Sequence, residues 1–411
     1  MKFIENVEKE KYIKFTDNHP KAHFLQSYAW GEFCKKAKGQ IPMYLGLEDS
    51  KGNLVVATLV LLKMTPIFGY SYGYAPRGFV ADYKDSKVLK EFTECLKDYM
   101  KKNKIIYIKF DPDIIYQEID EQANPIEGGF NNYKLFDYMI SLGYKHKGFY
   151  RLYNGNQPRY TFRIDLKKPW EEVEAKMSKS FLKSVKRSEQ YDLTINNQVD
   201  NHTFWLLMKH NSEKDGFGIN SEKYYELFTN TLNDDGHLKY FNIVIKPKQL
   251  TKNIASQIEE LKKQLETNKK KAADIQNQIA RLEKELSVFS EVKEDEKTIC
   301  SLVCTYTKKH AWSFYIGNDA LANFTFAITR AYYEAIKDAY DNGYEFFDLF
   351  GTPGDPNTKF KNLANIHDFK RKFGDQYTEF MGEFDLVNKK GFYTILPFLL
   401  KIYRKFRKIE R

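Results

Sequence analysis

At about 150 residues per domain, a chain of 411 residues is long enough for two or three domains, which excludes a small disulfide-stabilised scaffold. Its 65 Lys and Arg against 55 Asp and Glu give a formal net charge of +10, and 42% hydrophobic residues exclude a disordered chain. The basic excess favours an anionic partner such as nucleic acid, anionic lipid or a phosphorylated substrate.

The four cysteines form neither a disulfide framework nor a metal-binding pattern. Cys300 and Cys304 fall in one expected strand, where four residues at about 3.3 Å each place them roughly 13 Å apart, too far to share an ion. The N-terminus is charged and carries no signal-like apolar stretch, and the longest apolar runs, 54–62 and 392–400, are far shorter than the roughly 20 residues of a membrane span. We therefore expect a cytoplasmic protein in a reducing compartment.

Strand and helix patterns alternate along most of the chain. The first series comprises strands at 54–62, 70–74 and 105–110 and a helix at 91–102. The second comprises a strand at 161–165, a long helix opening near Pro169, a strand at 193–196, helices at 202–213 and 221–232, and a strand at 238–245. The third comprises strands at 298–306 and 311–317, a helix at 323–342 and a strand at 345–351. This alternation predicts two α/β units in tandem.

Residues 250–292 contain no Gly or Pro and carry a coiled-coil seam. Its positions, spaced by three and four, are Ile258, Leu261, Leu265, Asn268, Ala272, Ile275, Ile279, Leu282, Leu286 and Phe289. One straight helix would be roughly 60 Å long and would strand the β-segments on either side of it far apart, so we expect two antiparallel helices turning around 267–271. The alternative is an arm that dimerises the protein. Five lysines at the tip, Lys262, Lys263, Lys269, Lys270 and Lys271, are candidates for contact with a phosphate backbone.

A denser basic cluster lies at 176–187 and contains no acidic residue. On a helix, Lys176, Lys179, Lys183 and Lys186 fall within about 80° of one another, opposite Met177, Phe181, Leu182 and Val185. Together with Arg187 they predict a cationic ridge for a nucleic-acid backbone, with a plain solvated face as the alternative.

The last 23 residues, 389–411, carry eight Lys or Arg and one Glu, a net +7 interleaved with aromatic and aliphatic residues. This composition is typical of a segment that docks on the fold or lies on an anionic membrane surface.

No motif for a metallohydrolase, a phosphoryl transferase or a serine hydrolase is present. Tandem α/β units are compatible with an acyl-coenzyme A acyltransferase, but the nearest match to its phosphate loop, 213–218, begins with Glu213 where a donor is needed.

A series of short motifs in order resembles the FemABX family of peptidoglycan-branching aminoacyltransferases over nearly the whole chain. The motifs are Gln26-Ser-x-x-Trp30, Tyr74-Ala-Pro-Arg77-Gly78, Phe110-Asp111-Pro112, the basic helix, Tyr224-Tyr225, the helical arm, Phe314-Tyr315-x-Gly317, Phe347-Asp348-Leu349-x-Gly351, Phe369-Lys370-x-x-Phe373 and Gly382-Glu383-Phe384-Asp385.

The resemblance implies an α/β fold of two tandem acetyltransferase-like (GNAT-like) subdomains with an inserted antiparallel two-helix arm. The first subdomain would comprise 1–150 plus a returning segment 381–411, the second 151–380, and the arm 248–297. Members move an amino acid from aminoacyl-tRNA to the stem-peptide amine of a lipid-linked or nucleotide-linked precursor, without a metal or cofactor. We accordingly expect aminoacyl-tRNA and a peptidoglycan precursor as partners, with an anionic membrane or a second copy of the chain as further ones.

The resemblance also suggests site residues. Lys370 matches the lysine associated with transfer, and an ammonium there suits stabilisation of the oxyanion. Phe369, Tyr315, Tyr224, Arg77, Lys35 and Lys109 are the substrate-binding candidates. Asp111 ends a strand, where it would orient the incoming amine or take its proton, or else would cap a turn. Arg77 would pair with an anionic group or act as a structural clamp.

Two positions depart from the family pattern. Cys34 stands where a phosphate-binding lysine is common, and Asn220 stands where some members have an arginine. The diphosphate would then be held differently, by Lys35 for example. The rival functions are an acyl-coenzyme A N-acyltransferase and a non-catalytic tRNA-binding or dimerising protein.

Overall fold

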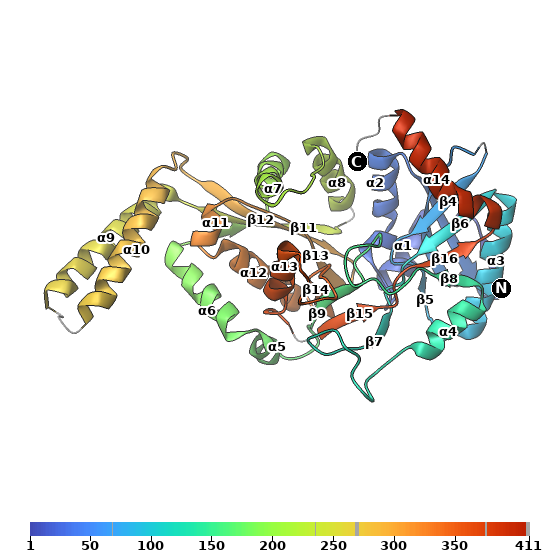
Figure 1. Ribbon diagram of the computed structural model, residues 1–411, viewed down its shortest axis with the longest axis horizontal. Helices are drawn as coiled ribbons and strands as arrows, with labels where there is room; N and C mark the ends of the chain where they lie inside the picture. The colour runs from blue at the N-terminus through green and yellow to red at the C-terminus, as the bar shows by residue number, and fades with distance from the viewer. Residues whose placement is uncertain (68, 235, 268–270, 375, 408–411) are drawn as a thin grey trace.

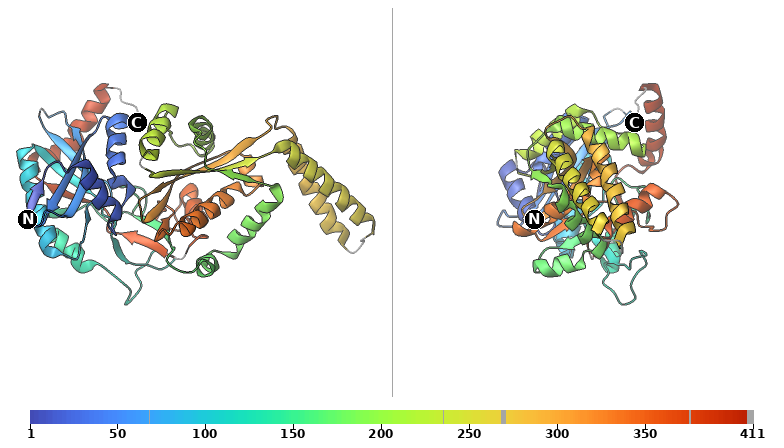
Figure 2. Two further views of the ribbon diagram at one scale, coloured as in Figure 1. Left: turned by 180° about the vertical axis from the view of Figure 1, so that it is seen from behind. Right: turned by 90° about the vertical axis from the view of Figure 1, so that its left-hand side faces the viewer.

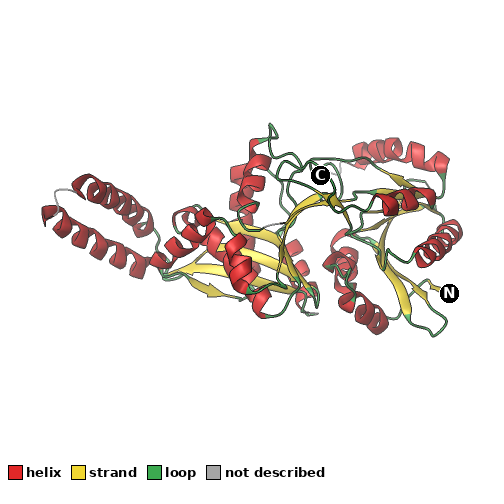
Figure 3. Ribbon diagram, turned by 90° about the horizontal axis from the view of Figure 1, so that it is seen from below, coloured by secondary structure: helices red, strands yellow, loops and turns green. Residues whose placement is uncertain are grey.

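The computed structural model describes residues 1–411 except 68, 235, 268–270, 375 and 408–411, and gives no side-chain description for 215 and 403–407. Two α/β halves lie side by side, and a helical hairpin projects from the far end of the second half (Figure 1; Figure 2). Seen from below, each half has its own sheet flanked by helices (Figure 3). The tandem α/β fold expected from the sequence is confirmed.

The first sheet has the strand order β1-β2-β3-β4-β6-β16-β8, with β5 paired to β3, and of the described strands of this sheet only β4 and β6 pair in parallel. Its strands are β1 (Lys2–Ile4), β2 (Ile41–Glu48), β3 (Leu54–Met64), β4 (Ser71–Ala75), β5 (Val80–Ala81), β6 (Ile105–Phe110), β8 (Tyr144–His146) and β16 (Phe384–Val387). The helices of this half are α1 (Lys9–Asn18), the short η1 (Phe24–Gln26), α2 (Tyr28–Lys38), α3 (Ser86–Lys102) and α4 (Tyr133–Ser141). Helix α3 packs on the sheet because Leu89, Phe92, Leu96 and Met100, spaced by three and four, are all buried.

The second sheet has the order β10-β11-β12-β13-β14-β9-β15-β7. Its strands are β7 (Ile115–Glu118), β9 (Tyr160–Asp165), β10 (Thr194–Asn196), β11 (Leu238–Ile245), β12 (Lys297–Tyr306), β13 (His310–Asn318), β14 (Phe346–Asp348) and β15 (Gln376–Phe380). Helices α7 (Asn201–Asp215) and α8 (Glu222–Asn233) cover one face (Figure 1). The other face carries α5 (Trp170–Lys176), α6 (Lys179–Ser188), the short η2 (Glu189–Tyr191), α11 (Leu321–Phe324), α12 (Ala327–Asp341) and α13 (Lys361–Lys370).

The two halves exchange strands. Strand β7, from the first third of the chain, pairs with β15 at the edge of the second sheet. Strand β16, from the C-terminal end, inserts between β6 and β8 of the first sheet. Neither sheet is therefore built from one continuous stretch of sequence.

Two expected helices are each broken in two. The long helix from Pro169 ends at Lys176, because Met177 is extended (ψ 142°) and the Ser178 hydroxyl caps α6 by accepting the backbone N–H of Phe181. The helix expected at 323–342 is interrupted by Phe326, whose φ of 59° is left-handed. The prediction of single helices was wrong at both places.

The arm is the antiparallel hairpin that the seam predicted. Helices α9 (Pro247–Thr267) and α10 (Ala272–Ser290) pack on each other and bury Ile258, Ile275, Ile279, Leu282 and Phe289. These apolar side chains of the seam are thus buried within one chain, while dimerisation through the arm stays a prediction. Asn268, Lys269 and Lys270 lie outside the described residues. Over the described part of the chain, no helix combines the length and apolar character required for crossing a membrane.

A buried ion-pair network joins the halves. Arg163 of β9 donates from Nη2 to Asp113 Oδ2 (2.5 Å), in the loop after β6 of the first sheet, and from Nε to Asp348 Oδ2 (2.7 Å) at the end of β14. All three side chains are buried. Burial alone would raise the pKa of Asp113, but the Arg163 guanidinium outweighs it and holds that pKa well below its usual range. We call this the Arg163 lock.

Replacing Arg163 by Met should lower the free energy of unfolding by about 3–5 kcal/mol, because two buried carboxylates lose their partner. Urea denaturation followed by circular dichroism measures this. The control, Lys97→Met, breaks an exposed pair with Glu94 and should cost less than about 1 kcal/mol. If both variants lost the same small amount of unfolding free energy, the role given to the lock would be contradicted.

Because the folded pKa of Asp113 is depressed, the lock stabilises fully above about pH 4 and its contribution is lost as the pH falls further. The difference in the free energy of unfolding between wild type and Arg163→Met should therefore become smaller as the pH falls below about 4.

Candidate active site

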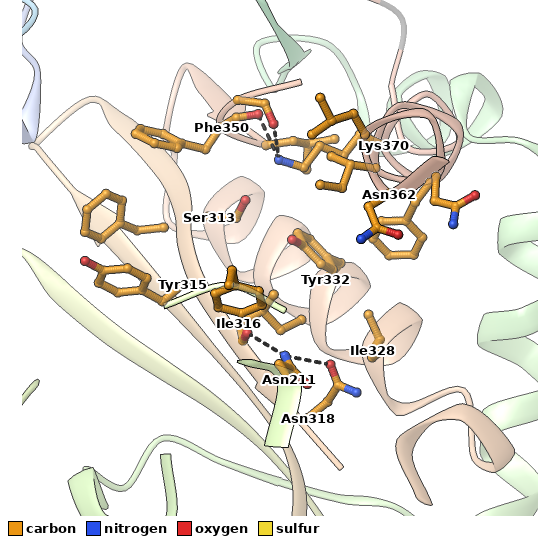
Figure 4. Close-up of a pocket in the computed structure, with 18 of the residues that line it drawn as sticks. Asn211, Ser313, Tyr315, Ile316, Asn318, Ile328, Tyr332, Phe350, Asn362 and Lys370 are labelled. Atoms are coloured by element: carbon orange, nitrogen blue, oxygen red, sulfur yellow. Dashed lines mark hydrogen bonds between the residues drawn. The ribbon is translucent and has the colours of Figure 1, made fainter. Parts of the chain in front are cut away.

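A cavity of about 890 Å³ opens in the second half, and we call it the C-terminal cavity. It is lined by β13, by α7, α12 and α13, by the turn after β14, and by the loop before β9 (Figure 4). Tyr315, Phe369 and Lys370 all line it, so the structure brings together three of the residues that the resemblance suggested.

Two of the sequence motifs meet at Lys370. Its Nζ, at the end of α13, donates to the backbone carbonyls of Phe350 (3.0 Å) and Gly351 (2.7 Å) in the Phe347–Gly351 motif (Figure 4). Among the hydrogen bonds of the described residues, these use two of the three ammonium donors, which leaves one for a ligand. Lys370 is therefore oriented in advance by backbone groups.

The turn that presents these carbonyls is itself fixed. The backbone of Phe350 is left-handed (φ 57°), and its N–H donates to Asp348 Oδ1 (2.7 Å). Gly351 lies against Pro158, where an added Cβ would come within 2.3 Å of the proline ring. Glycine is thus required here for the loop before β9 to close over the turn.

The environment of Lys370 weakens its charge. Burial of the ammonium end lowers its pKa to about 8, an effect that Asp348 opposes, although the side chain as a whole is half-buried. At neutral pH most of the population still carries the ammonium, and its charge acts in a partly desolvated site. Such an ammonium is suited to stabilising a developing oxyanion.

Tyr315 reaches the C-terminal cavity from β13 and interacts with the Tyr224 phenol of α8. Burial raises the pKa of both phenols, so both are neutral near pH 7. The Tyr224 ring packs on Phe33 of α2 at 5.1 Å, which connects this wall to the first half.

A second cavity of about 400 Å³ lies in the first half, and we call it the N-terminal cavity. Trp30, Cys34 and Lys38 line it from one face of α2, at successive steps of four residues. Burial raises the pKa of the Cys34 thiol to about 11, against the nearby charges of Lys38 and Lys63. The position where the family often has a lysine is thus a neutral thiol flanked by two other lysines.

Lys109 also lines the N-terminal cavity, but its charge is balanced. Its Nζ binds Glu383 Oε2 (2.7 Å) and Asp385 Oδ1 (3.1 Å) of β16 and the turn before it. Burial would lower the pKa of Lys109, but the two carboxylates outweigh this effect and raise it. Direct binding of substrate by Lys109 stays a prediction.

Two adjacent residues of one segment, Gln157 and Pro158, line different cavities. Gln157 lines the N-terminal cavity and Pro158 lines the C-terminal cavity, and both line a small cavity that also contains Asp111 and Arg77. Asp111 therefore lies behind the segment where the two larger cavities approach each other.

Asp111 is buried, and both its carboxyl oxygens have partners. Oδ1 accepts the backbone N–H of Arg77 (2.7 Å) and Oδ2 accepts the Tyr74 hydroxyl (2.8 Å). Burial raises its pKa to about 6, although Arg77 acts against the shift. The group thus holds the Pro-Arg-Gly turn in place and is also able to exchange a proton near neutral pH.

Arg77 joins the two halves. Its Nη2 donates to the Pro158 carbonyl (2.6 Å), and its guanidinium lies over the Phe380 ring at 4.4 Å. These contacts agree with a structural-clamp role, one of the two alternatives given above for Arg77. The other alternative, binding of an anionic substrate group, stays a prediction.

The remaining candidates lie outside both cavities. Lys35 is exposed on α2 and lines neither of them. Lys179, Lys183 and Lys186 are exposed on α6 while Phe181 and Val185 are buried beneath them, as the ridge interpretation requires. The expectation that Lys176 shares this helix face was wrong, because Lys176 ends α5 and the extended Met177 separates it from α6. The Arg187 guanidinium lies over the Phe326 ring at 4.5 Å.

Lys38 and Lys63 also line the N-terminal cavity and were not predicted from the sequence as cavity residues. Lys38 was recognisable, because it stands eight residues after Trp30 and therefore on the same helix face. Lys63 follows an apolar strand and gave no comparable signal. Among the described residues, no three or more His, Cys, Asp or Glu side chains are grouped so as to hold a metal ion.

Comparison with known proteins relates this geometry to a family. The FemAB family model matches residues 7–401. Lipid II:glycine glycyltransferase of Staphylococcus aureus (strain bovine RF122 / ET3-1) is 26% identical over 444 aligned positions, covering 99% of each chain. The protein of the same name from Staphylococcus haemolyticus (strain JCSC1435) is 25% identical and covers 95% of this chain and 94% of its own.

Among solved structures, the crystal structure of FemX shares the fold, with a TM-score of 0.76 at 22% identity over 96% of this chain and 100% of that one. Since the family model spans nearly the whole chain, the chain belongs to the FemAB family of aminoacyltransferases.

Proposed function

We propose that this chain transfers an amino acid from aminoacyl-tRNA to the stem-peptide amine of a lipid-linked peptidoglycan precursor, on the cytoplasmic side of the membrane. The observation that carries the proposal is a pair of cavities lined by the adjacent residues Gln157 and Pro158, with the pre-oriented Lys370 ammonium in one and a lysine-lined wall in the other. The relatives named for lipid II support the lipid-linked acceptor.

In this proposal the C-terminal cavity holds the aminoacyl ester. The acceptor amine attacks the ester carbonyl, a C–N bond forms, and the C–O bond to the tRNA ribose breaks. Lys370 stabilises the oxyanion with its third N–H, while positioning of the two substrates supplies much of the remaining rate enhancement. The proton lost by the amine ends on the departing ribose oxygen.

Asp111 is the candidate to relay that proton. Its pKa of about 6 lies close to the working pH, as a proton-transfer group requires. It lies in the small cavity between the two larger ones, next to the path along which the amine would enter.

The N-terminal cavity would hold the precursor. Lys38 and Lys63 flank the Cys34 thiol and supply the positive charge that a diphosphate needs in the absence of a lysine at 34. The α6 ridge would contact the tRNA backbone.

Charged tRNA and acetyl-coenzyme A, each incubated with a lysine- or diaminopimelate-bearing precursor, separate the proposal from its rivals. We expect transfer from charged tRNA. Transfer from the coenzyme alone would make the chain an acyl-coenzyme A acyltransferase, and tRNA binding without any transfer would make it a binding protein.

Replacing Lys370 by Ala should lower kcat about 100- to 1000-fold, because the oxyanion loses its pre-oriented donor. Single-turnover transfer from charged tRNA measures the rate, and a filter-binding assay should show unchanged tRNA affinity. Lys372→Ala, an exposed lysine two residues further on, is the matched control. Near-normal transfer by the Lys370 variant would refute the role.

Lys38→Ala and Lys63→Ala should each raise KM for the precursor about tenfold, because each removes a charge-assisted contact to the diphosphate. Lys35→Ala serves as the control, since this side chain lies outside the cavity. If instead Lys35→Ala raised KM and the other two did not, the diphosphate would bind on the outer face of α2.

Reversing Lys179, Lys183 and Lys186 to Glu should weaken tRNA binding and lower the slope of log affinity against log salt concentration by about two to three units. Reversal of three exposed lysines, Lys84 just before α3 and Lys87 and Lys90 within it, provides a control of equal charge change. The same loss in both triple variants would show that net charge rather than the ridge governs binding.

A further inference from the structure

The C-terminal helix α14 (Lys390–Arg407) exposes a strip of large apolar side chains. Phe398 is 65% exposed, Ile395 46% and Ile402 37%. At 100° per residue these three fall within about 60° of one another, so they form one continuous strip along the helix.

A different face of α14 packs on the fold, which leaves this strip uncovered. Leu396 is buried, the Phe392 ring packs on Tyr70 at 4.8 Å and the Tyr393 ring on Tyr107 at 5.3 Å. Leu396 is about 100° around the helix from Ile395, so the packed face and the exposed strip are neighbours rather than the same surface. The helix is apolar over a wider arc than docking on the fold requires.

The other flank of the strip is cationic. Lys390 and Lys401, both exposed, lie within about 20° of each other on the wheel and about 60–80° from Phe398. The helix contains no acidic residue, and the last 23 residues of the sequence carry a net charge of +7. An apolar strip bordered by lysines is the pattern of helices that lie in the headgroup region of anionic bilayers.

A protein partner fits this surface less well, because lysine is depleted at protein–protein interfaces. We infer that α14 is a membrane-surface helix that inserts Ile395, Phe398 and Ile402 among the headgroups of an anionic bilayer.

The position of α14 also relates the membrane contact to the site, and this step rests on the proposed function. Tyr393 O–H donates to Asp385 Oδ2 (2.7 Å) and Lys147 Nζ donates to the Tyr393 hydroxyl (2.9 Å), so the first turn of the helix is fixed to the first sheet. Tyr107, against which Tyr393 packs, lines the N-terminal cavity. Docking of α14 thus holds that cavity next to the bilayer surface, where the diphosphate of a lipid-linked precursor lies.

Co-sedimentation of the full chain with vesicles tests the inference without tRNA or precursor. We expect binding to vesicles of equal parts phosphatidylglycerol and phosphatidylcholine and little binding to pure phosphatidylcholine. Phe398→Glu should weaken binding about tenfold or more, because it places a charge in the apolar strip. Lys401→Glu should weaken it as well and reduce its dependence on salt.

The matched control is Phe130→Glu, which changes a 56%-exposed phenylalanine in the segment between β7 and α4 and should leave binding unchanged. The inference is overturned if the wild type stays in the supernatant with the anionic vesicles, or if Phe398→Glu sediments as the wild type does. It is also overturned if light scattering shows a dimer that Phe398→Glu dissociates, because a second copy would then cover the strip.

Transfer assays separate this inference from the proposed function. Phe398→Glu should retain transfer to a water-soluble, nucleotide-linked precursor and lose it for a lipid-linked precursor in vesicles. Absence of transfer in the wild type would refute the proposed function and leave the vesicle result standing.

Discussion

The buried ion pair between Arg163 and Asp348 connects the architecture of this protein to its site. On one side, Arg163 extends the pair to Asp113 and so fixes the second sheet against the first. On the other, Asp348 accepts the N–H of Phe350 and holds the turn whose carbonyls orient Lys370. The contact that fixes the two halves against each other therefore also helps to fix where the Lys370 ammonium lies.

Lys370 is oriented by backbone carbonyls, and a side-chain carboxylate in their place would weaken the oxyanion role proposed for it. A carboxylate in direct contact with Lys370 would raise its pKa and neutralise its field, whereas two carbonyls orient the ammonium and leave its charge available. Asp348 lies near enough to oppose the effect of burial, yet the pKa of Lys370 still falls to about 8. Lys370 is consequently positioned by hydrogen bonds to the two carbonyls and not by a direct ion pair with a carboxylate.

The sequence predicted the elements better than the connections between them. Strand β11 matches its expected bounds, and the seam gave the hairpin, because both depend on local periodicity. The break at Phe326 was not predictable, since a left-handed backbone is uncommon for phenylalanine and no Gly, Asn or Asp stands at this position. The family resemblance singled out Lys370, but its two acceptors are main-chain carbonyls, which no residue pattern encodes. Lys35 was chosen for standing next to Cys34, whereas helical spacing brings Lys38 to the cavity.

The exchange of β7 and β16 between the sheets has a consequence for synthesis of the chain. While the ribosome is making the first two-thirds, β6 lacks the neighbour that it needs on one side, and β8 cannot join the sheet. That gap closes only when residues 384–387 have been synthesised and have left the exit tunnel. The half of the fold that is synthesised first is thus completed after the other half. A prematurely terminated chain would expose an unpaired strand edge prone to aggregation.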